Sequence, residues 1–264
     1  MSRRDETSEG ALLGLLLSAP IVAIPLFQIP MMIWARWTFY QRHPDYVQHS
    51  APTISRAISD PAIGGPFAMM ILAVTAVVLF ALVPIFCGYR TAIEIRFAHD
   101  PAMRRALIAR VWLALALQII GSAGMVVCTQ FTFANDHDLH MLGSYVFFVG
   151  QGGAIAMSGF LCARLAKSSP LEAVAPFALL PRMSRIRARA ALTVAFMAAL
   201  YLCLFAIKGI ELPISEYTIY YIYTVQEIFT ISAFTVYLAL FAPDIFAIGR
   251  SFHAVRASAQ AASR

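Results

Sequence analysis

The sequence predicts an all-α protein, a bundle of six transmembrane helices with both termini in the cytosol. Three observations support this fold class. Hydrophobic residues make up 60% of the 264 positions and charged residues only 13%, whereas a soluble domain carries about 25% charged residues. Apolar segments long enough to cross a bilayer, about 20 residues each, recur along the whole chain. The basic residues gather in alternate connections between these segments.

Six apolar segments are predicted to span the membrane within a single domain, residues 1–264. They cover about residues 11–34, 66–89, 107–130, 140–162, 190–210 and 218–241. The first segment is too long and too rich in proline for a cleaved signal peptide. Because Pro20, Pro25 and Pro30 remove backbone donors, we expect this helix to be kinked or locally unwound. Residues 35–65 are predicted to form the longest loop.

The distribution of Lys and Arg predicts the orientation. Of these 20 residues, 16 lie in the N-terminus, the 90–110 and 163–189 connections and the C-terminal tail, and 4 lie in the other connections. Positively charged connections stay in the cytosol. Residues 35–65, 131–139 and 211–217 are therefore expected to face the lumen or the cell exterior. The formal charge of +6 reflects this topology and not binding to nucleic acid, because the arginines flank apolar spans.

The sequence contains no cofactor or metal motif. Its four cysteines lie inside apolar segments, so no disulfide framework is implied. Asp136, His137 and Asp138 carry ligating and acid–base groups, but their spacing matches no known metal site. We therefore interpret this trio as a solvated acidic loop. No nucleophile motif, glycine-rich phosphate loop or zinc pattern occurs in the sequence.

Polar side chains follow one face of the fourth apolar segment. In a helix, one stripe would carry four of them at offsets 0, 4, 11 and 18, namely His140, Ser144, Gln151 and Ser158. Such a stripe must face protein or water, because unsatisfied polar groups in hydrocarbon cost several kcal/mol each. We expect it to point into the bundle.

Two further segments carry polar groups at membrane depth. Gln118 and Ser122 share one face of the third segment. Glu227 lies about 13 Å into the sixth segment at the usual helical rise, where a charge costs at least about 2.5 kcal/mol. Tyr220 and Tyr223 share its helical face. If the three polar faces point inward, they enclose a cavity open to the lumen. The alternative is that the Gln and Ser side chains only form interhelical hydrogen bonds.

Three local patterns occur in order along the chain. The first is Pro52-Thr53-Ile54-Ser55, followed by Ala57-Ile58; the second is His140, with Phe147, Phe148 and Gly150 behind it; the third is Glu227, with Asp244 seventeen residues on. Together with six spans they resemble the Frag/DRAM/Sfk family. That family includes the GPI-anchor lipid-remodelling proteins of the Golgi, the N-terminal half of Cwh-type proteins and the damage-regulated autophagy modulators.

The branch of the family is left open by these patterns. The first pattern and the Glu–Asp spacing resemble the GPI-remodelling branch, but Ser59-Asp60-Pro61 stands where that branch implies Pro-Gln-Arg. Gly143, Phe147 and Gly150 are more similar to the autophagy-modulator branch.

The resemblance implies a protein that handles membrane lipids, and GPI-anchor lipid remodelling in a lumen-facing cavity is the favoured form. His140 and Glu227 are the candidate catalytic residues, which would orient the substrate or shuttle a proton. The candidate substrate-binding residues are Ser144, Gln151, Gln118, Ser122, Tyr220, Tyr223 and Ser55. The expected partner is a GPI-type lipid or phospholipid. A second membrane protein would supply the oxyanion donor, because the sequence offers no firm one.

Other functions stay open, and so does whether the chain is an enzyme. The alternative is a non-enzymatic regulator or scaffold, similar to the autophagy modulators, in which the polar stripes fix helix packing. A small transporter is disfavoured, because the sequence shows no repeated half and one deep acid. The expected compartment is the Golgi or ER, with the lysosomal or plasma membrane as the alternative.

Overall fold

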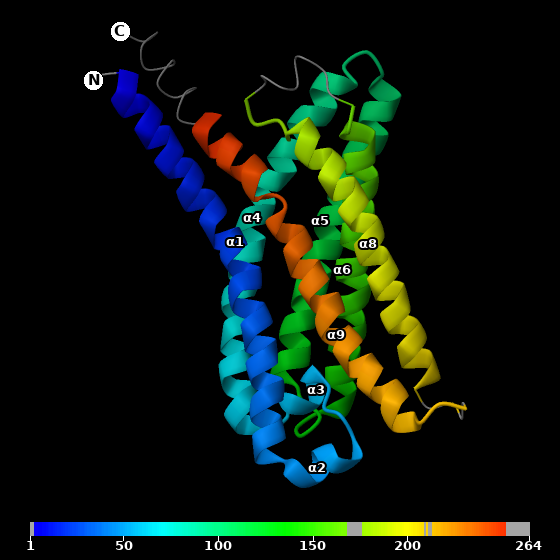
Figure 1. The fold of residues 1–264 in the computed structure, drawn as a ribbon. Coiled ribbons are helices and arrows are strands. Elements are labelled where there is room, and N and C mark those ends of the chain that lie inside the picture. Colours follow the sequence, from blue (N-terminus) through cyan, green and yellow to red (C-terminus); the bar gives the residue numbers. More distant parts are fainter. Residues whose placement is uncertain (1–2, 168–175, 209, 211–212, 252–264) are drawn as a thin grey trace.

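The computed structural model describes residues 3–167, 176–208, 210 and 213–251, and these residues form helices with no strand among them (Figure 1). Six of the described helices are long and apolar enough to cross a membrane. They are α1 (Arg3–Arg42), α4 (Pro61–Arg96), α5 (Pro101–Gln130), α6 (His137–Leu165), α8 (Pro181–Ile207) and α9 (Glu216–Ala239), with residues 242–251 helical after a turn. Two short helices, α2 (Pro44–His49) and α3 (Ile54–Ala57), follow α1. The prediction of an all-α bundle with six spans is confirmed.

Local sequence explains where three of the long helices begin. Asp60 and Asp100 each precede a proline that opens a helix, and each side chain accepts a hydrogen bond from a backbone N–H of the first turn. Asp136 does the same at the start of α6, where it accepts from the N–H of Leu139 at 3.0 Å. Aspartate is a favoured N-cap, and proline at the first helical position lacks only a donor that would be unpaired there. The Asp136 carboxylate therefore caps a helix.

Most helices extend beyond the predicted spans. α1 continues to Arg42 and α4 to Arg96, so the expected 35–65 loop is shorter and partly helical, and only residues 97–100 separate α4 from α5. α8 and α9 instead end at Ile207 and Ala239, slightly before the predicted limits. The predicted limits follow the ends of the apolar stretches. A helix satisfies its own backbone hydrogen bonds, so it can continue past those limits into the polar boundary of the bilayer.

α1 stays helical through Pro20, Pro25 and Pro30, so it is not locally unwound. Figure 1 shows that its axis changes direction along its length. A proline inside a helix removes one hydrogen bond and bends the axis without ending the helix when neighbouring helices support it. The predicted kink is therefore observed as a bend.

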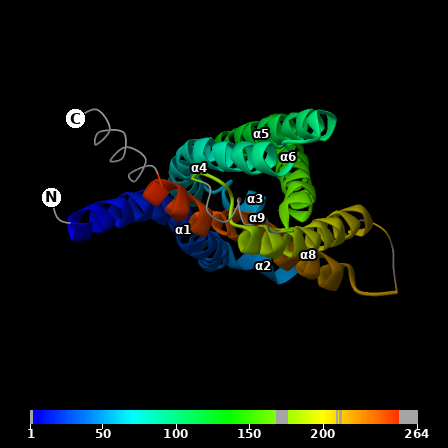
Figure 2. The same ribbon diagram turned by 90° about the horizontal axis from the view of Figure 1, so that it is seen from above.

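The six long helices pack as a closed ring. Each helix contacts the next in the order α1, α4, α5, α6, α8 and α9, and α9 returns to α1. Seen from above, α9 lies between α1 and α8, and α4 and α5 lie on the far side (Figure 2). The first residues of α1 and residue 251 lie at the same end of the bundle, which we call the terminal end (Figure 1). The opposite end carries α2, α3 and residues 131–136, and we call it the loop end.

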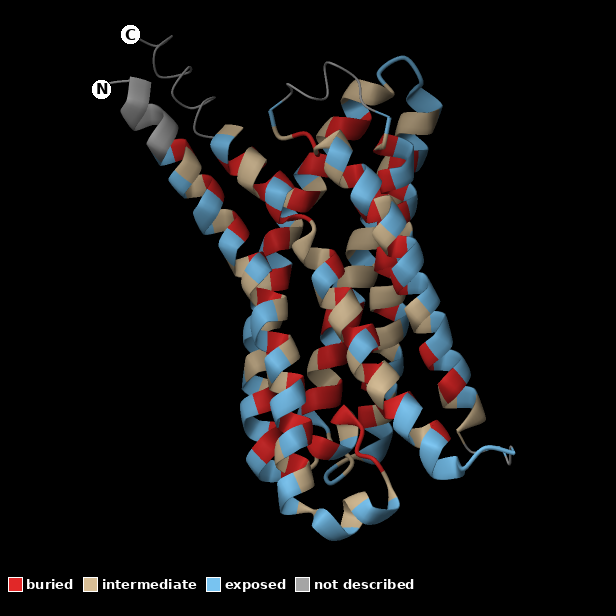
Figure 3. Ribbon diagram, in the orientation of Figure 1, coloured by how far each residue is buried: buried red, intermediate tan, exposed pale blue. Residues whose placement is uncertain are grey.

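Buried residues face the interior of this ring, and the outward surfaces are exposed (Figure 3). Large apolar side chains such as Leu26, Phe27, Leu192 and Phe196 are among the most exposed. A water-soluble protein seldom exposes so many large apolar side chains on one continuous surface. This surface is suited to contact with lipid tails.

Residues 51–58, which we call the tucked segment, fold back into the loop end of the ring (Figure 1). Ala51, Ile54, Ala57 and Ile58 are buried. Thr53 caps α3 by accepting a hydrogen bond from the N–H of Arg56 at 3.0 Å. The segment lies so close to α4 that a Cβ on Gly64 would meet the Ile58 carbonyl oxygen at 2.2 Å.

A carboxylate outside the spans fixes the end of this segment. The Asp60 side chain accepts hydrogen bonds from Arg42 Nε at 2.6 Å and from the N–H of Ala62 at 2.9 Å, and it lies 2.9 Å from His43 Nε2. Burial raises the pKa of Asp60, but the bonds from Arg42, His43 and Ala62 outweigh it and lower this pKa to about 2 from its usual 3.8.

This lowered pKa predicts a pH dependence of stability. Because Asp60 binds its proton less tightly when folded, its contribution of up to about 2 kcal/mol is present above pH 4 and is lost as the pH falls through about 2. Purified wild type should therefore be more stable than Asp60→Asn near neutral pH, and the gap should close between pH 4 and pH 2. Asparagine keeps the helix cap, so a gap independent of pH would contradict the assignment.

Candidate functional site

The acid in the last long helix binds the tucked segment. Glu227 is 4% exposed, and its Oε2 accepts a hydrogen bond of 2.8 Å from the backbone N–H of Ile54. Ile54 is the first residue of α3, where backbone N–H groups lack helical partners. A carboxylate in this position satisfies one of these donors and complements the positive end of the helix dipole. Glu227 thus joins α9 to the Pro52-Thr53-Ile54-Ser55 pattern.

Two cations act on the Glu227 carboxylate. They are Arg36 of α1 and Lys208, which follows α8. Arg36 is 9% exposed, donates from Nη2 to Thr224 Oγ1 at 3.0 Å, and lies over the rings of Tyr40 and Tyr221. Opposite charges and hydrogen bonds offset the desolvation of a buried carboxylate. For Glu227 desolvation is the largest effect, and the bond from Ile54 and the two cations offset it only in part.

The candidate tyrosines lie beside Lys208. Tyr223 is buried and shares a hydrogen bond of 3.0 Å with Tyr201, on which its ring stacks. Tyr220 is half-buried, with its ring centroid 5.7 Å from that of Tyr223. The Lys208 ammonium lies 4.6 Å from the Tyr223 ring and 4.2 Å from that of Phe205. Burial lowers the pKa of this ammonium, and the negative charge of Glu227 opposes that effect.

His140 lies at the junction of α5 and α6 and is wholly buried. Its Nδ1 lies 2.7 Å from the Cys128 carbonyl oxygen and 2.8 Å from that of Phe131. Carbonyls only accept, so Nδ1 carries a proton and satisfies carbonyls in the last turn of α5. The Nε2 atom has no hydrogen-bond partner within the described residues. In the neutral ring it therefore presents a free lone pair.

No hydrogen bond joins His140 and Glu227 in the part of the chain that the structure describes. His140 bonds to the Cys128 carbonyl of α5, Glu227 bonds to Ile54, and neither residue lines the two cavities described below. The other loop-end candidates are less enclosed: Ser144 and Ser55 are half-buried.

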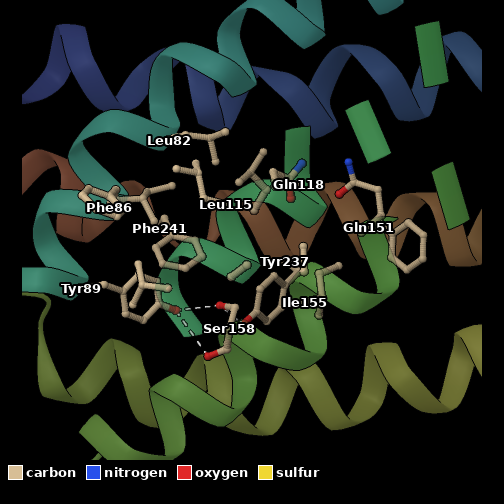
Figure 4. A pocket seen from close by; sticks show the side chains of 16 residues that line it. Leu82, Phe86, Tyr89, Leu115, Gln118, Gln151, Ile155, Ser158, Tyr237 and Phe241 are labelled. Atoms are coloured by element: carbon tan, nitrogen blue, oxygen red, sulfur yellow. Dashed lines mark hydrogen bonds between the residues drawn. The ribbon is translucent and has the colours of Figure 1, made fainter. Parts of the chain in front are cut away.

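A small cavity of about 60 Å³ lies deeper in the ring, between α4, α5, α6 and α9 (Figure 4). Gln118 and Gln151 lie together on one side of it. On the other side Ser158 Oγ lies 2.7 Å from the hydroxyls of Tyr89 and Tyr237. Most of the remaining lining is aliphatic or aromatic. A space of this size with polar groups in its lining has room for a few water molecules.

A second cavity of about 50 Å³ adjoins the first and extends to α1. Gln118 and Gln151 line both cavities, and Ser122 and Gln28 line the second. Gln118 Nε2 donates to Ser122 Oγ at 3.4 Å, a long hydrogen bond. Three residues that the sequence marked as substrate-binding candidates, Gln118, Ser122 and Gln151, therefore line these small cavities at membrane depth.

Several polar residues of the interior were missed by the sequence reasoning. In the sequence Arg36 reads as a topology charge, Gln28 stands alone in an apolar segment, and Arg187 belongs to the basic 163–189 connection. Arg187 is wholly buried and forms an ion pair with Asp244. A signal was available, because Ser184, Arg187 and Ala191 are spaced for one helix face. The charge-based interpretation of residues 163–189 obscured it.

Comparison with known proteins agrees with this architecture. Residues 13–248 match the family described as Frag1/DRAM/Sfk1/Cwh43P N-terminal domain. No curated protein and no solved structure matches the chain significantly. Since the match spans all six long helices, the chain is a multi-pass membrane protein that belongs to the Frag1/DRAM/Sfk1/Cwh43P N-terminal domain family.

Proposed function

We propose that this protein handles membrane lipids and that its specific task is the lipid remodelling of GPI anchors, in the Golgi or ER. The observation that carries the proposal is the hydrogen bond from Ile54 N–H to Glu227 Oε2. It joins two sequence patterns that separately resemble the GPI-remodelling branch, one before α4 and one in α9. Residues 173 positions apart thus form one site at the loop end.

The chemistry of this site divides between two residues. The free Nε2 lone pair of His140 would accept a proton from a lipid hydroxyl, as a general base in acyl transfer must. Because this ring is wholly buried, the step requires the loop end to open and admit the hydroxyl. Glu227 is a positioning residue, because its carboxylate is held by Ile54 and compensated by cations. The lipid hydroxyl is then the nucleophile, and the oxyanion donor would come from a partner membrane protein.

We expect wild type to restore surface retention of a GPI-anchored reporter in cells that lack their own GPI-lipid remodelling protein. Glu227→Gln and His140→Ala should fail to restore it at equal expression. Glutamine still accepts from Ile54 but loses the charge that faces Arg36 and Lys208. Alanine removes the lone pair and leaves buried carbonyls unpaired.

Two controls share the chemistry but not the position. Glu216→Gln removes an exposed acid from the first turn of α9, and His137→Ala removes an exposed histidine one turn before His140. Both should restore retention as wild type does. If all four variants behave alike, the site assignment is wrong even where wild type is active.

One observation favours a second candidate, a non-enzymatic regulator or scaffold of lysosomal, Golgi or plasma membranes. Glu227 and the Nδ1 atom of His140 both make bonds that hold helices and the tucked segment together. If well-expressed wild type does not restore retention, this second function is favoured and the GPI proposal fails.

A further inference from the structure

An open groove of about 590 Å³ lies between α1 and α9 at the loop end, and we call it the α1–α9 groove. The two helices diverge toward this end of the bundle (Figure 1). Part of the lining belongs to the exposed outer surface, notably Trp37 at 65% and Ile33 at 56% exposure. The volume lies within the range of about 300–1,000 Å³ that is usual for ligand sites. The groove is therefore large enough for part of a lipid and opens toward the bilayer.

The α1–α9 groove crosses the boundary between head groups and hydrocarbon. Arg36 and Tyr217 line it just outside the apolar segments predicted for α1 and α9. Ile33 and Ile228 line it within those segments. Trp and Tyr side chains gather at this level of a bilayer, and four of them line the groove, namely Trp37, Tyr40, Tyr217 and Tyr221. One end of the groove therefore lies among head groups and the other among acyl chains.

Arg36 has hydrogen-bond donors that the protein does not use. Its Nη2 donates to Thr224 Oγ1 at 3.0 Å, and its side chain makes no other hydrogen bond within the described residues. The guanidinium is held over two rings, 5.8 Å from the centroid of Tyr40 and 5.6 Å from that of Tyr221. A guanidinium carries five donors in a planar fork that matches the oxygens of a phosphate. Arg36 is thus fixed in place with donors left for an oxyanion.

The charges around this site leave a positive excess. Arg36 and Lys208 both act on the Glu227 carboxylate, so two cations face one anion. Among the described residues that line the groove, Arg36 is the only charged one. A charge that is largely removed from water is costly unless an opposite charge accompanies it. A lipid phosphate with one negative charge would balance the excess, which favours an anionic phospholipid over an uncharged lipid.

We propose that the α1–α9 groove binds an anionic phospholipid, with its phosphate on Arg36 and one acyl chain along Ile33 and Ile228. The rest of the molecule stays in the surrounding bilayer, to which the groove is open. This inference goes beyond the proposed function and does not depend on it, because an enzyme and a scaffold can both hold such a lipid. The alternative is that the four aromatic side chains only anchor the helices at the membrane interface.

The test is photolabelling of the purified full chain in phosphatidylcholine nanodiscs with a phosphatidylglycerol that carries a diazirine in one acyl chain. We expect labelled peptides from α1 and α9. Unlabelled phosphatidylglycerol should compete, whereas diacylglycerol, which lacks the phosphate, and inorganic phosphate, which lacks the acyl chains, should not. Arg36→Met should reduce labelling at least about tenfold, the effect of losing hydrogen bonds to a charged group.

The matched control is Arg56→Met. Arg56 is an exposed arginine at the loop end that also lies over two aromatic rings, those of Tyr46 and Phe133, and it does not line the groove. Both substitutions remove one positive charge from the same end of the bundle. Arg56→Met should keep wild-type labelling, so the comparison separates binding in the groove from general attraction of anionic lipids to a basic surface.

A second variant leaves every charge in place, because Arg36→Met also takes a cation away from Glu227. Ile33→Trp adds volume at an exposed position in the apolar part of the groove. It should lose labelling and keep the thermal midpoint of wild type. Leu26→Trp places the same side chain on α1 about two turns away, at a position that is 67% exposed and outside the groove, and should keep labelling.

Three results would overturn the inference. They are labelling of Ile33→Trp equal to that of wild type, competition by diacylglycerol equal to that by phosphatidylglycerol, and an equal loss of labelling in Arg36→Met and Arg56→Met. Retention of the GPI-anchored reporter is measured separately. Restored retention without labelling of α1 and α9 would remove this inference and leave the proposed function, and labelling without restored retention would do the reverse.

Discussion

Replacing Arg187 with methionine is expected to destabilise the folded protein by about 3–5 kcal/mol, the cost of leaving one member of a buried ion pair without its partner. Arg187 and Asp244 are both wholly buried. Their pair joins α8 to the helical residues that follow α9. The measurement is unfolding of the purified protein in mixed micelles with increasing dodecyl sulfate.

The reason for so large an effect is the number of groups that depend on this guanidinium. It donates to Asp244 and to the Leu240 carbonyl at 3.0 Å, and it lies 4.2 Å from the Phe241 ring. Asp244 also accepts from the N–H of Leu180 at 2.6 Å. Removing the cation leaves a buried carboxylate with one remaining backbone donor.

Two further variants distinguish the loss of the buried ion pair from the loss of a positive charge in general. Arg185→Met removes an exposed arginine from the same helix and should change stability by less than about 0.5 kcal/mol. The double variant Arg187→Met/Asp244→Leu should recover most of the lost stability, because apolar residues can replace a buried ion pair at little cost. A double variant as unstable as Arg187→Met alone would contradict this account.

The sequence was sufficient for the class of fold and for the helices that build the site. Hydrophobic length and basic connections predict six spans, and helical spacing places His140, Gln151 and Ser158 on one face of α6. Both signals, segment hydrophobicity and helical periodicity, are properties of the local sequence. The end of α1 at Arg42 could not be predicted in the same way, because the helix continues into residues whose polarity is typical of a loop.

Contacts between distant segments were beyond sequence reasoning. The bond between Ile54 and Glu227 joins a short helix in an apparent loop to a helix 173 residues later. Gln28 was overlooked because one glutamine between Phe27 and Ile29 has no periodic partner in its own segment. Its importance arises only when Gln118 and Gln151 line the same cavity from other helices. Sequence patterns describe one helix at a time, whereas side chains from several helices form these sites.

Placing a methyl group on Gly150 is expected to destabilise the bundle by about 1–3 kcal/mol, the cost of forcing extra volume into a packed interface. A Cβ at this position would lie 2.5 Å from Gly121 Cα and 2.6 Å from Gly121 N. These are backbone atoms of α5 and cannot rotate away. Unfolding of Gly150→Ala in mixed micelles measures the effect, and Gly152→Ala is the control on the same helix.

The control should behave in the opposite way. A Cβ on Gly152 meets nothing within 4 Å, so alanine there should leave stability unchanged or raise it by about 0.5–1 kcal/mol through its better helix propensity. The contrast also bears on the cavities, because the close approach of Gly121 and Gly150 sets the spacing of the helices that carry Gln118 and Gln151. Equal stabilities for the two alanine variants would show that α5 and α6 are not in backbone contact at this level.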